Sequence, residues 1–180
     1  MNDTLTLPEL IEEGKSAYKR GDFLASAQAY QATAQGYEAA GDSLTAAEML
    51  NNACVAYLRA GDGEAALQAV DGTPEVFAQA QDMHRQGIAL GNLGATLDAL
   101  KRLDEAADAY QRSADLLGQA GEEDLRAHVL KSLSVLQLRK GDQMQAVATM
   151  QSSLDAGQKS AGKTNIFARL LKRPPKQVVK

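Results

Sequence analysis

The sequence has 180 residues but no tryptophan, one cysteine, two histidines and four prolines. One cysteine cannot form an internal disulfide, and with two histidines it cannot supply the usual four ligands of a structural zinc site. Few prolines, few β-branched runs and many alanines favour helix over a β-sandwich or barrel. These shortages predict an all-α fold that needs neither a disulfide framework nor a metal.

Long apolar runs are also missing. No stretch approaches the roughly 20 apolar residues that a transmembrane helix needs, and the start of the chain lacks the basic and apolar regions of a signal peptide. With 44% hydrophobic and 23% charged residues, the composition is typical of a folded domain. We therefore expect a soluble, cytoplasmic protein.

Charge is unevenly distributed. The net charge is −4, but residues 1–155 carry 12 basic and 23 acidic residues, whereas residues 156–180 carry seven basic residues and no acidic one. An acidic body repels nucleic acid, so we expect no nucleic-acid partner for residues 1–155. The basic tail is suited to weak contact with an anionic membrane.

A turn signal recurs every 20 residues. A glycine at the end of a helix adopts the left-handed conformation easily, and an aspartate after it can accept hydrogen bonds from the next helix. Each such dipeptide therefore predicts the end of one helix and the start of another, running antiparallel to the first. The signal is Gly-Asp at 21–22, 41–42, 61–62 and 141–142, with weaker versions at 81–82, 101–102 and 121–122.

Small residues show that the full repeat is 40 residues long. They recur in the first helix of each expected pair and again in the second, where they allow close approach of helix backbones. The first set is Gly14, Cys54, Gly94 and Ser134, and the second is Ser26, Ala66, Ala106 and Ala146. This pattern predicts a solenoid of about four antiparallel helix pairs within residues 1–157, at approximately 7–40, 47–80, 87–120 and 127–157.

The third pair resembles the tetratricopeptide repeat (TPR) family, through Leu90, Leu93-Gly94, Leu97, Ala106 and Tyr110. The repeat length resembles that of the 40-residue class of this family. The resemblance implies a right-handed α-solenoid whose first helices line a concave groove. It also implies a non-catalytic scaffold or adaptor that binds a peptide or helix of another protein in this groove.

One segment interrupts the repeat. Asp71-Gly72-Thr73-Pro74 falls inside the expected second helix of pair two, where proline removes a hydrogen-bond donor and clashes with the preceding turn. Thr73 followed by Pro74 is instead typical of a helix start. We expect a short helix over 62–71, a kink, and a new helix from residue 74.

The resemblance also implies which residues face the groove. Asn52 and Asn92 hold equivalent repeat positions, and each amide could bind the main chain of a peptide or merely satisfy a neighbouring helix. Ile11 and Ile88 stand where chaperone-binding members carry polar or charged residues, which disfavours a cochaperone role. The candidate peptide-binding residues are Lys15, Asn51, Asn52, Arg59, Asn92, Lys131 and Arg139.

Signals for catalysis are weak. Residues 157–164 fit the phosphate-binding pattern G-x-x-x-x-G-K-[ST], but no strand is expected before them, so a flexible linker is the preferred interpretation. His84 and His128 have no nucleophile at a short spacing, and Cys54 holds a packing position typical of a buried, inert thiol. We expect no catalytic residues, no cofactor, no metal and no enzymatic activity.

The basic tail, residues 158–180, leaves several interpretations open. Residues 164–172 could form a short helix that caps the solenoid, with Ile166, Phe167, Leu170 and Leu171 as its apolar residues. They could instead dock on an anionic membrane or an acidic partner, occupy the chain's own groove, or remain disordered. The alternative function is therefore a tether that acts through this tail.

Overall fold

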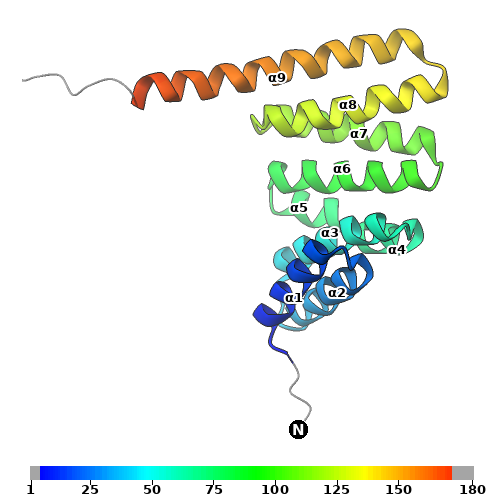
Figure 1. The fold of residues 1–180 in the computed structure, drawn as a ribbon, viewed down its shortest axis with the longest axis vertical. Helices are drawn as coiled ribbons and strands as arrows, with labels where there is room; N and C mark the ends of the chain where they lie inside the picture. The colour runs from blue at the N-terminus through cyan, green and yellow to red at the C-terminus, as the bar shows by residue number, and fades with distance from the viewer. Residues whose placement is uncertain (1–4, 172–180) are drawn as a thin grey trace, which may run out of the picture.

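The computed structural model describes the backbone of residues 5–171 and the side chains of residues 5–161. Throughout this part of the chain the regular structure is helical, and successive helices pack side by side as a solenoid (Figure 1). The all-α solenoid of helix pairs is thus confirmed. The helices are α1 (Leu7–Arg20), α2 (Phe23–Ala39), α3 (Ser43–Ala60), α4 (Gly63–Val70), α5 (Thr73–Gln79), α6 (Met83–Ala99), α7 (Leu103–Gln119), α8 (Glu123–Lys140) and α9 (Gln143–Leu171).

The 20-residue turn signal acts as expected. An Asp side chain accepts a hydrogen bond from the backbone N–H three residues later at the start of α2, α3, α4 and α6. The glycines before these starts and before α9 have positive φ, between 80° and 90° at residues 21, 41, 61 and 141. At the two turns without glycine, Gln81 and Lys101 are forced into the same left-handed region, with φ of 57° and 64°.

The predicted break in pair two is confirmed. Helix α4 ends at Val70, and α5 begins at Thr73 with Pro74 in its first turn, where a missing N–H donor costs little. The Thr73 hydroxyl donates a 2.9 Å hydrogen bond to the Val70 carbonyl, which joins the two short helices. Two helices thus take the place of the single second helix of this pair.

Small residues allow the helices of a pair to approach closely. A Cβ added at Gly94 would lie 2.7 Å from the Tyr110 ring, and one added at Gly14 would lie 3.1 Å from the Tyr30 ring. The other two pairs carry Cys54 with Val70 and Ser134 with Met150 at the same 16-residue spacing. Where the glycine is replaced by a larger residue, the aromatic partner is replaced too, which keeps the packed volume similar.

Helix α9 differs from the sequence-based expectation. The linker predicted over residues 157–164 is wrong, because α9 runs without interruption from Gln143 to Leu171. A glycine inside a helix costs only about 1 kcal/mol, and no proline follows until Pro174. The backbone of α9 therefore continues past the start of α8 (Figure 1). The side chains of the proposed capping segment, residues 164–172, lie outside the described residues.

Candidate functional site

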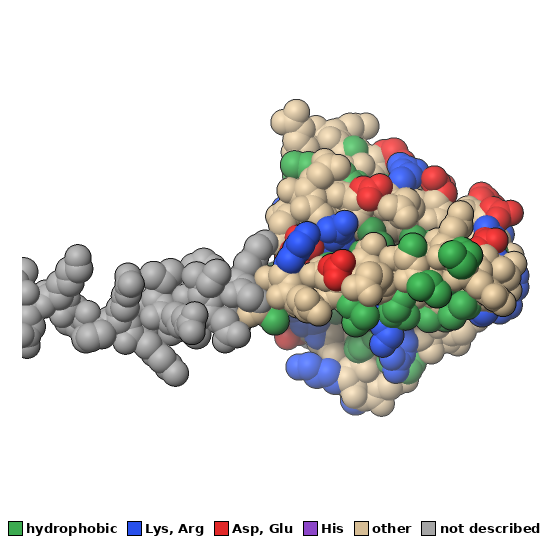
Figure 2. Space-filling model, turned by 90° about the horizontal axis from the view of Figure 1, so that it is seen from above, with side chains coloured by type: hydrophobic (Ala, Val, Ile, Leu, Met, Phe, Trp, Pro, Cys, Tyr) green, Lys and Arg blue, Asp and Glu red, His purple; other side chains and the backbone are tan. Residues whose placement is uncertain are grey.

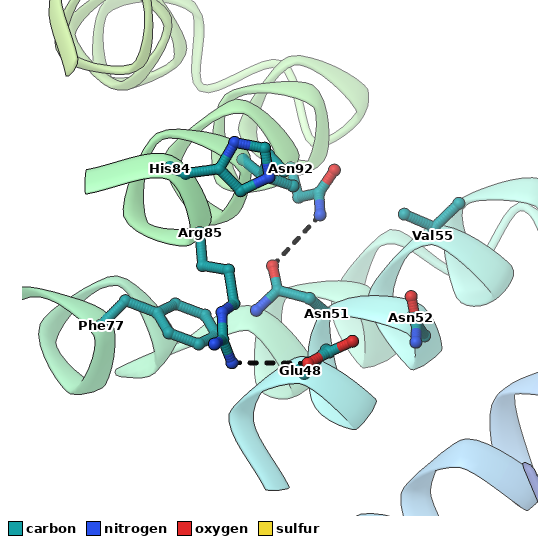
Figure 3. A pocket seen from close by; sticks show the side chains of 9 residues that line it. Glu48, Asn51, Asn52, Val55, Phe77, His84, Arg85 and Asn92 are labelled. Carbon is teal, nitrogen blue, oxygen red and sulfur yellow. Dashed lines mark hydrogen bonds and ion pairs between the residues drawn. The ribbon is translucent and has the colours of Figure 1, made fainter. Parts of the chain in front are cut away.

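The first helices of consecutive pairs form one face of the solenoid, which we call the inner face. A cavity of about 530 Å³ opens on it where α3 and α6 meet beside α5 (Figure 3). A smaller cavity of about 180 Å³ lies between α6, α7 and α8, and both cavities include Ile88 and Asn92 of α6 in their walls. We call the two together the inner groove. The larger cavity is lined by Glu48, Asn51, Asn52, Val55, Phe77, His84, Arg85, Ile88 and Asn92.

Asn51 organises the floor of the larger cavity. Its amide nitrogen donates to the Ala47 carbonyl and to the Thr73 hydroxyl, both at 2.9 Å, and its amide oxygen accepts from Asn92 at 3.1 Å (Figure 3). The side chain is 6% exposed, so these bonds form away from water. Asparagine is a poor residue for a helix interior, but here it links α3 to α5 and α6. The sequence-predicted site residue Asn51 thus has an internal structural role.

Asn52 and Asn92 are differently occupied. Asn92 uses its amide nitrogen on Asn51, which leaves its amide oxygen without a printed protein partner in the described part of the chain. Asn52 is half-buried in the cavity wall and makes no side-chain hydrogen bond to any described residue. Both polar groups therefore face the cavity with hydrogen-bonding capacity to spare.

The charged groups of the cavity are paired with one another. The Arg85 guanidinium contacts Asp82 at 2.7 Å and Glu48 at 3.5 Å, and it lies over the Phe77 ring at 5.7 Å. His84 Nδ1 lies 3.1 Å from a carboxylate oxygen of Glu122. The backbone N–H of Arg85 and then its charge lower the pKa of Asp82, which keeps that carboxylate ionised. The wall is therefore polar but close to electrically balanced.

The remaining sequence-predicted site residues lie outside both cavities. Lys15 pairs with Glu12 at 2.8 Å, and the Arg59 guanidinium lies 4.9 Å from the centre of the Phe23 ring. Arg139 donates to both carboxylate oxygens of Asp98, at 2.6 and 2.5 Å. Lys131 is exposed on α8 and has no ion pair with a described residue. The inner groove thus brings together Asn51, Asn52 and Asn92 but not the four predicted basic residues.

The candidate nucleophile is buried. Cys54 is fully shielded from solvent, 3.3 Å from the Thr96 hydroxyl, and burial raises the pKa of its thiol to about 11. A neutral, inaccessible thiol is a poor nucleophile. The phosphate-loop match at 157–164 lies inside α9, where backbone N–H groups are bonded within the helix. Among the described residues, no group of three or more His, Cys, Asp or Glu side chains is placed to hold a metal.

Comparisons with known proteins identify the fold but no family. The sequence matches no protein-family model and no curated protein. The crystal structure of MamA is 19% identical over 89% of this chain and 83% of MamA, with a TM-score of 0.66. The apo form of RapI is 14% identical over 87% of this chain, which spans 57% of RapI, with a TM-score of 0.71. BtubC from P. vanneervenii is 14% identical over 97% of this chain and 68% of BtubC, with a TM-score of 0.66.

These solved structures are TPR-like helical repeat proteins, so the chain has a TPR-like fold. At such low identity the likeness concerns the fold alone. None of the helices in the described part of the chain is long and apolar enough to cross a membrane.

Sequence analysis missed several residues that shape the groove. Phe77 and Arg85 line the larger cavity because α5 turns toward α6, and no local pattern specifies that turn. Ile88 was considered only as evidence against a cochaperone role, although it lines both cavities. The repeat register offered a signal, because residues 48, 88 and 128 are equivalent positions and each of them lines a cavity.

Proposed function

We propose that the protein is a non-catalytic interaction module that binds an extended segment of a partner protein in the inner groove. One observation carries the proposal: Asn52 and Asn92, at equivalent positions of adjacent repeats, face a 530 Å³ cavity with unused hydrogen-bonding groups. The TPR-like fold supports it, because solenoids of this kind present extended binding surfaces.

The amide groups suit a peptide main chain. Each residue of an extended peptide offers one N–H donor and one C=O acceptor, and a free Asn amide can satisfy both. Asn52 has its whole amide available, whereas Asn92 has its oxygen available because its nitrogen is held by Asn51. We therefore assign Asn52 as the two-sided contact and Asn92 as an acceptor for a peptide N–H.

The cavity wall suits a neutral or apolar partner side chain. Val55 and Ile88 supply apolar surface, and the nearby charges of Glu48 and Arg85 are paired with each other. A charged partner side chain would have to break this pair, whereas an apolar side chain gains free energy by leaving water. At the margins, Lys15, Arg59, Lys131 and Arg139 would contact acidic residues of the partner, with Lys131 the most readily available.

The test is a selection of peptides from a random displayed library on the full chain, followed by affinity measurements on variants. Asn52→Ala is expected to weaken binding about tenfold, the value of one well-made hydrogen-bond pair, with an unchanged melting temperature. Gln35→Ala on α2 is the matched control, because this exposed amide lies on a second helix, and it should bind like wild type.

Two results would contradict the proposal. Equal affinity of wild type, Asn52→Ala and Ile88→Ser would place the selected peptides outside the inner groove. Binding that survives Asn52→Ala but is lost at high salt would favour the alternative tether, because the tail contributes seven positive charges and exposed charges are screened by salt.

A further inference from the structure

Helix α9 carries an apolar stripe on its outer side. Met144, Val147 and Leu154 are 86%, 67% and 55% exposed, and their spacing of three and seven residues places them along one side of the helix. Figure 2 looks down on the α9 end of the solenoid and shows hydrophobic side chains gathered on this surface. We call Met144, Val147 and Leu154 the α9 stripe.

The repeat register indicates what kind of surface this is. The stripe residues are equivalent to Asp104, Ala107 and Ala114 of α7, one repeat earlier. There Asp104 accepts a 2.5 Å hydrogen bond from Lys140 of α8, and Ala114 is fully buried. In α2 the corresponding side faces α3, where Tyr57 donates to Gln31 at 2.7 Å. The stripe therefore lies where the first helix of a following pair would pack.

The rest of this sequence does not supply that cover. Met144 lies 27 residues before Leu171, or about 40 Å along the helix. The nine residues after Leu171 span at most about 30 Å when fully extended, so they do not reach Met144. Another chain is needed to cover the whole stripe.

The opposite end of a second copy fits poorly. The outer side of α1 carries Glu13 and Ser16, at positions held by the buried residues Leu133 and Leu136 in α8. Packing α1 on the stripe would bury the Glu13 carboxylate and break its 3.0 Å ion pair with Arg20, which is costly. The stripe of a second copy, in contrast, offers a matching apolar surface.

We propose that two copies of the chain pack α9 against α9 in antiparallel orientation about a twofold axis near Leu154. Charge favours this orientation over the parallel one. Asp142 and Asp155 are exposed in the first part of the α9 region, whereas the sequence from Ala156 onward is only basic. Antiparallel packing brings the basic half of one helix toward the acidic half of the other, and parallel packing brings like charges together.

The size of the contact sets the expected affinity. A helix of 29 residues is about 43 Å long, so a strip roughly 10 Å wide buries roughly 400 Å² on each copy. This area is at the lower end for specific association, and we expect a micromolar dimer. The inference is independent of the inner groove.

Sedimentation velocity of the full chain from 1 to 200 µM tests the dimer. Wild type is expected to shift from monomer to dimer, and Val147→Glu/Leu154→Glu should weaken the dimer at least tenfold without loss of helicity, because both side chains are exposed. The matched control, Leu5→Glu/Leu24→Glu, makes the same exchange at exposed positions near the other end and should dimerise like wild type. A wild-type monomer at 200 µM, or a dimer unaffected by the stripe variant, would overturn the proposal and leave the stripe to a different partner.

Engineered disulfides test the orientation. The native Cys54 is buried, so an introduced thiol is the reactive one. Leu154→Cys is expected to form a crosslinked dimer readily, whereas Met144→Cys should not, because the two copies of residue 144 lie at opposite ends of an antiparallel contact. Crosslinking of Met144→Cys as fast as Leu154→Cys would overturn the antiparallel arrangement.

Discussion

The two ends of the solenoid carry opposite surfaces on the same scaffold. At the α1 end, Glu13 and Ser16 face solvent and both contact Arg20, at 3.0 and 2.9 Å. At the equivalent positions of α8, Leu133 and Leu136 are buried. At the α9 end, Val147 and Leu154 are apolar and exposed. The repeat register fixes where a residue points, and the presence or absence of a neighbouring pair decides which side chain is stable there.

The largest effect is expected from removing an apolar side chain at one end and a polar one at the same register of the other. Leu136→Ala should lower the free energy of unfolding by about 2–5 kcal/mol, because the side chain is fully buried and leaves a cavity. Ser16→Ala should change it by less than about 0.5 kcal/mol. Urea unfolding followed by circular dichroism measures both, and equal losses would contradict the comparison.

The difference between the ends can also be removed. Glu13→Leu/Ser16→Leu gives α1 the side chains that α8 carries, so its outer side should then pack on the α9 stripe of another copy. Such a head-to-tail contact does not close, and we expect species larger than a dimer in sedimentation velocity at 10–200 µM. Adding Val147→Glu/Leu154→Glu is the control and should abolish these species. A double-leucine variant that sediments like wild type would contradict the account of the α1 end.

The ends also differ from the middle in their turns. Helices α1 and α8 are followed by Gly21 and Gly141 with positive φ, whereas α6 is followed by Leu100 and by Lys101 with φ of 64°. Lys101→Gly relieves an unfavourable backbone conformation and should raise the free energy of unfolding by about 0.5–1 kcal/mol. The reverse exchange, Gly141→Ala, should lower it by about 1 kcal/mol. Thermal melting distinguishes the two, and a loss on Lys101→Gly would contradict this interpretation.

The smallest effects concern pH, which should act on the two ends in opposite directions. Hydrogen bonds from the Thr6 backbone N–H and hydroxyl lower the pKa of Glu9, so its contribution is present above about pH 4.5 and is lost as pH falls through the lowered value. The hydrogen bond to Asp104 raises the pKa of Lys140, so its contribution is present below about pH 10.4 and is lost as pH rises through the raised value.

Melting temperatures at pH 7, 3.5 and 11 measure these contributions. Glu9→Gln should reduce the loss between pH 7 and 3.5, and Lys140→Met should reduce the loss between pH 7 and 11. Variants that follow the wild-type profile at both extremes would show that neither group contributes.

Local signals made much of the fold predictable. The Gly-Asp turns and the Thr73-Pro74 start depend on a few adjacent residues, and each is found where the sequence predicts it. Helix α9 was predicted less well, because Gly157 and Gly162 resemble a linker when read alone, and their cost is small within a long helix.

The candidate site was predictable only in part. Register alone placed Asn52 and Asn92 at equivalent positions, and both line the larger cavity. The internal role of Asn51 depends on Thr73, 22 residues away, and on Asn92, 41 residues away. Such contacts follow from how α5 and α6 pack on α3, which no local pattern specifies.

The most direct test of the central claim is a titration of the ¹⁵N-labelled chain with a selected peptide, observing the side-chain amide signals of asparagine and glutamine. The account predicts that the Asn52 and Asn92 signals shift together with the backbone signals of α3 and α6, and that the Gln35 signal on α2 does not move. Shifts confined to α2 or α9, with Asn52 and Asn92 unchanged, would contradict binding in the inner groove.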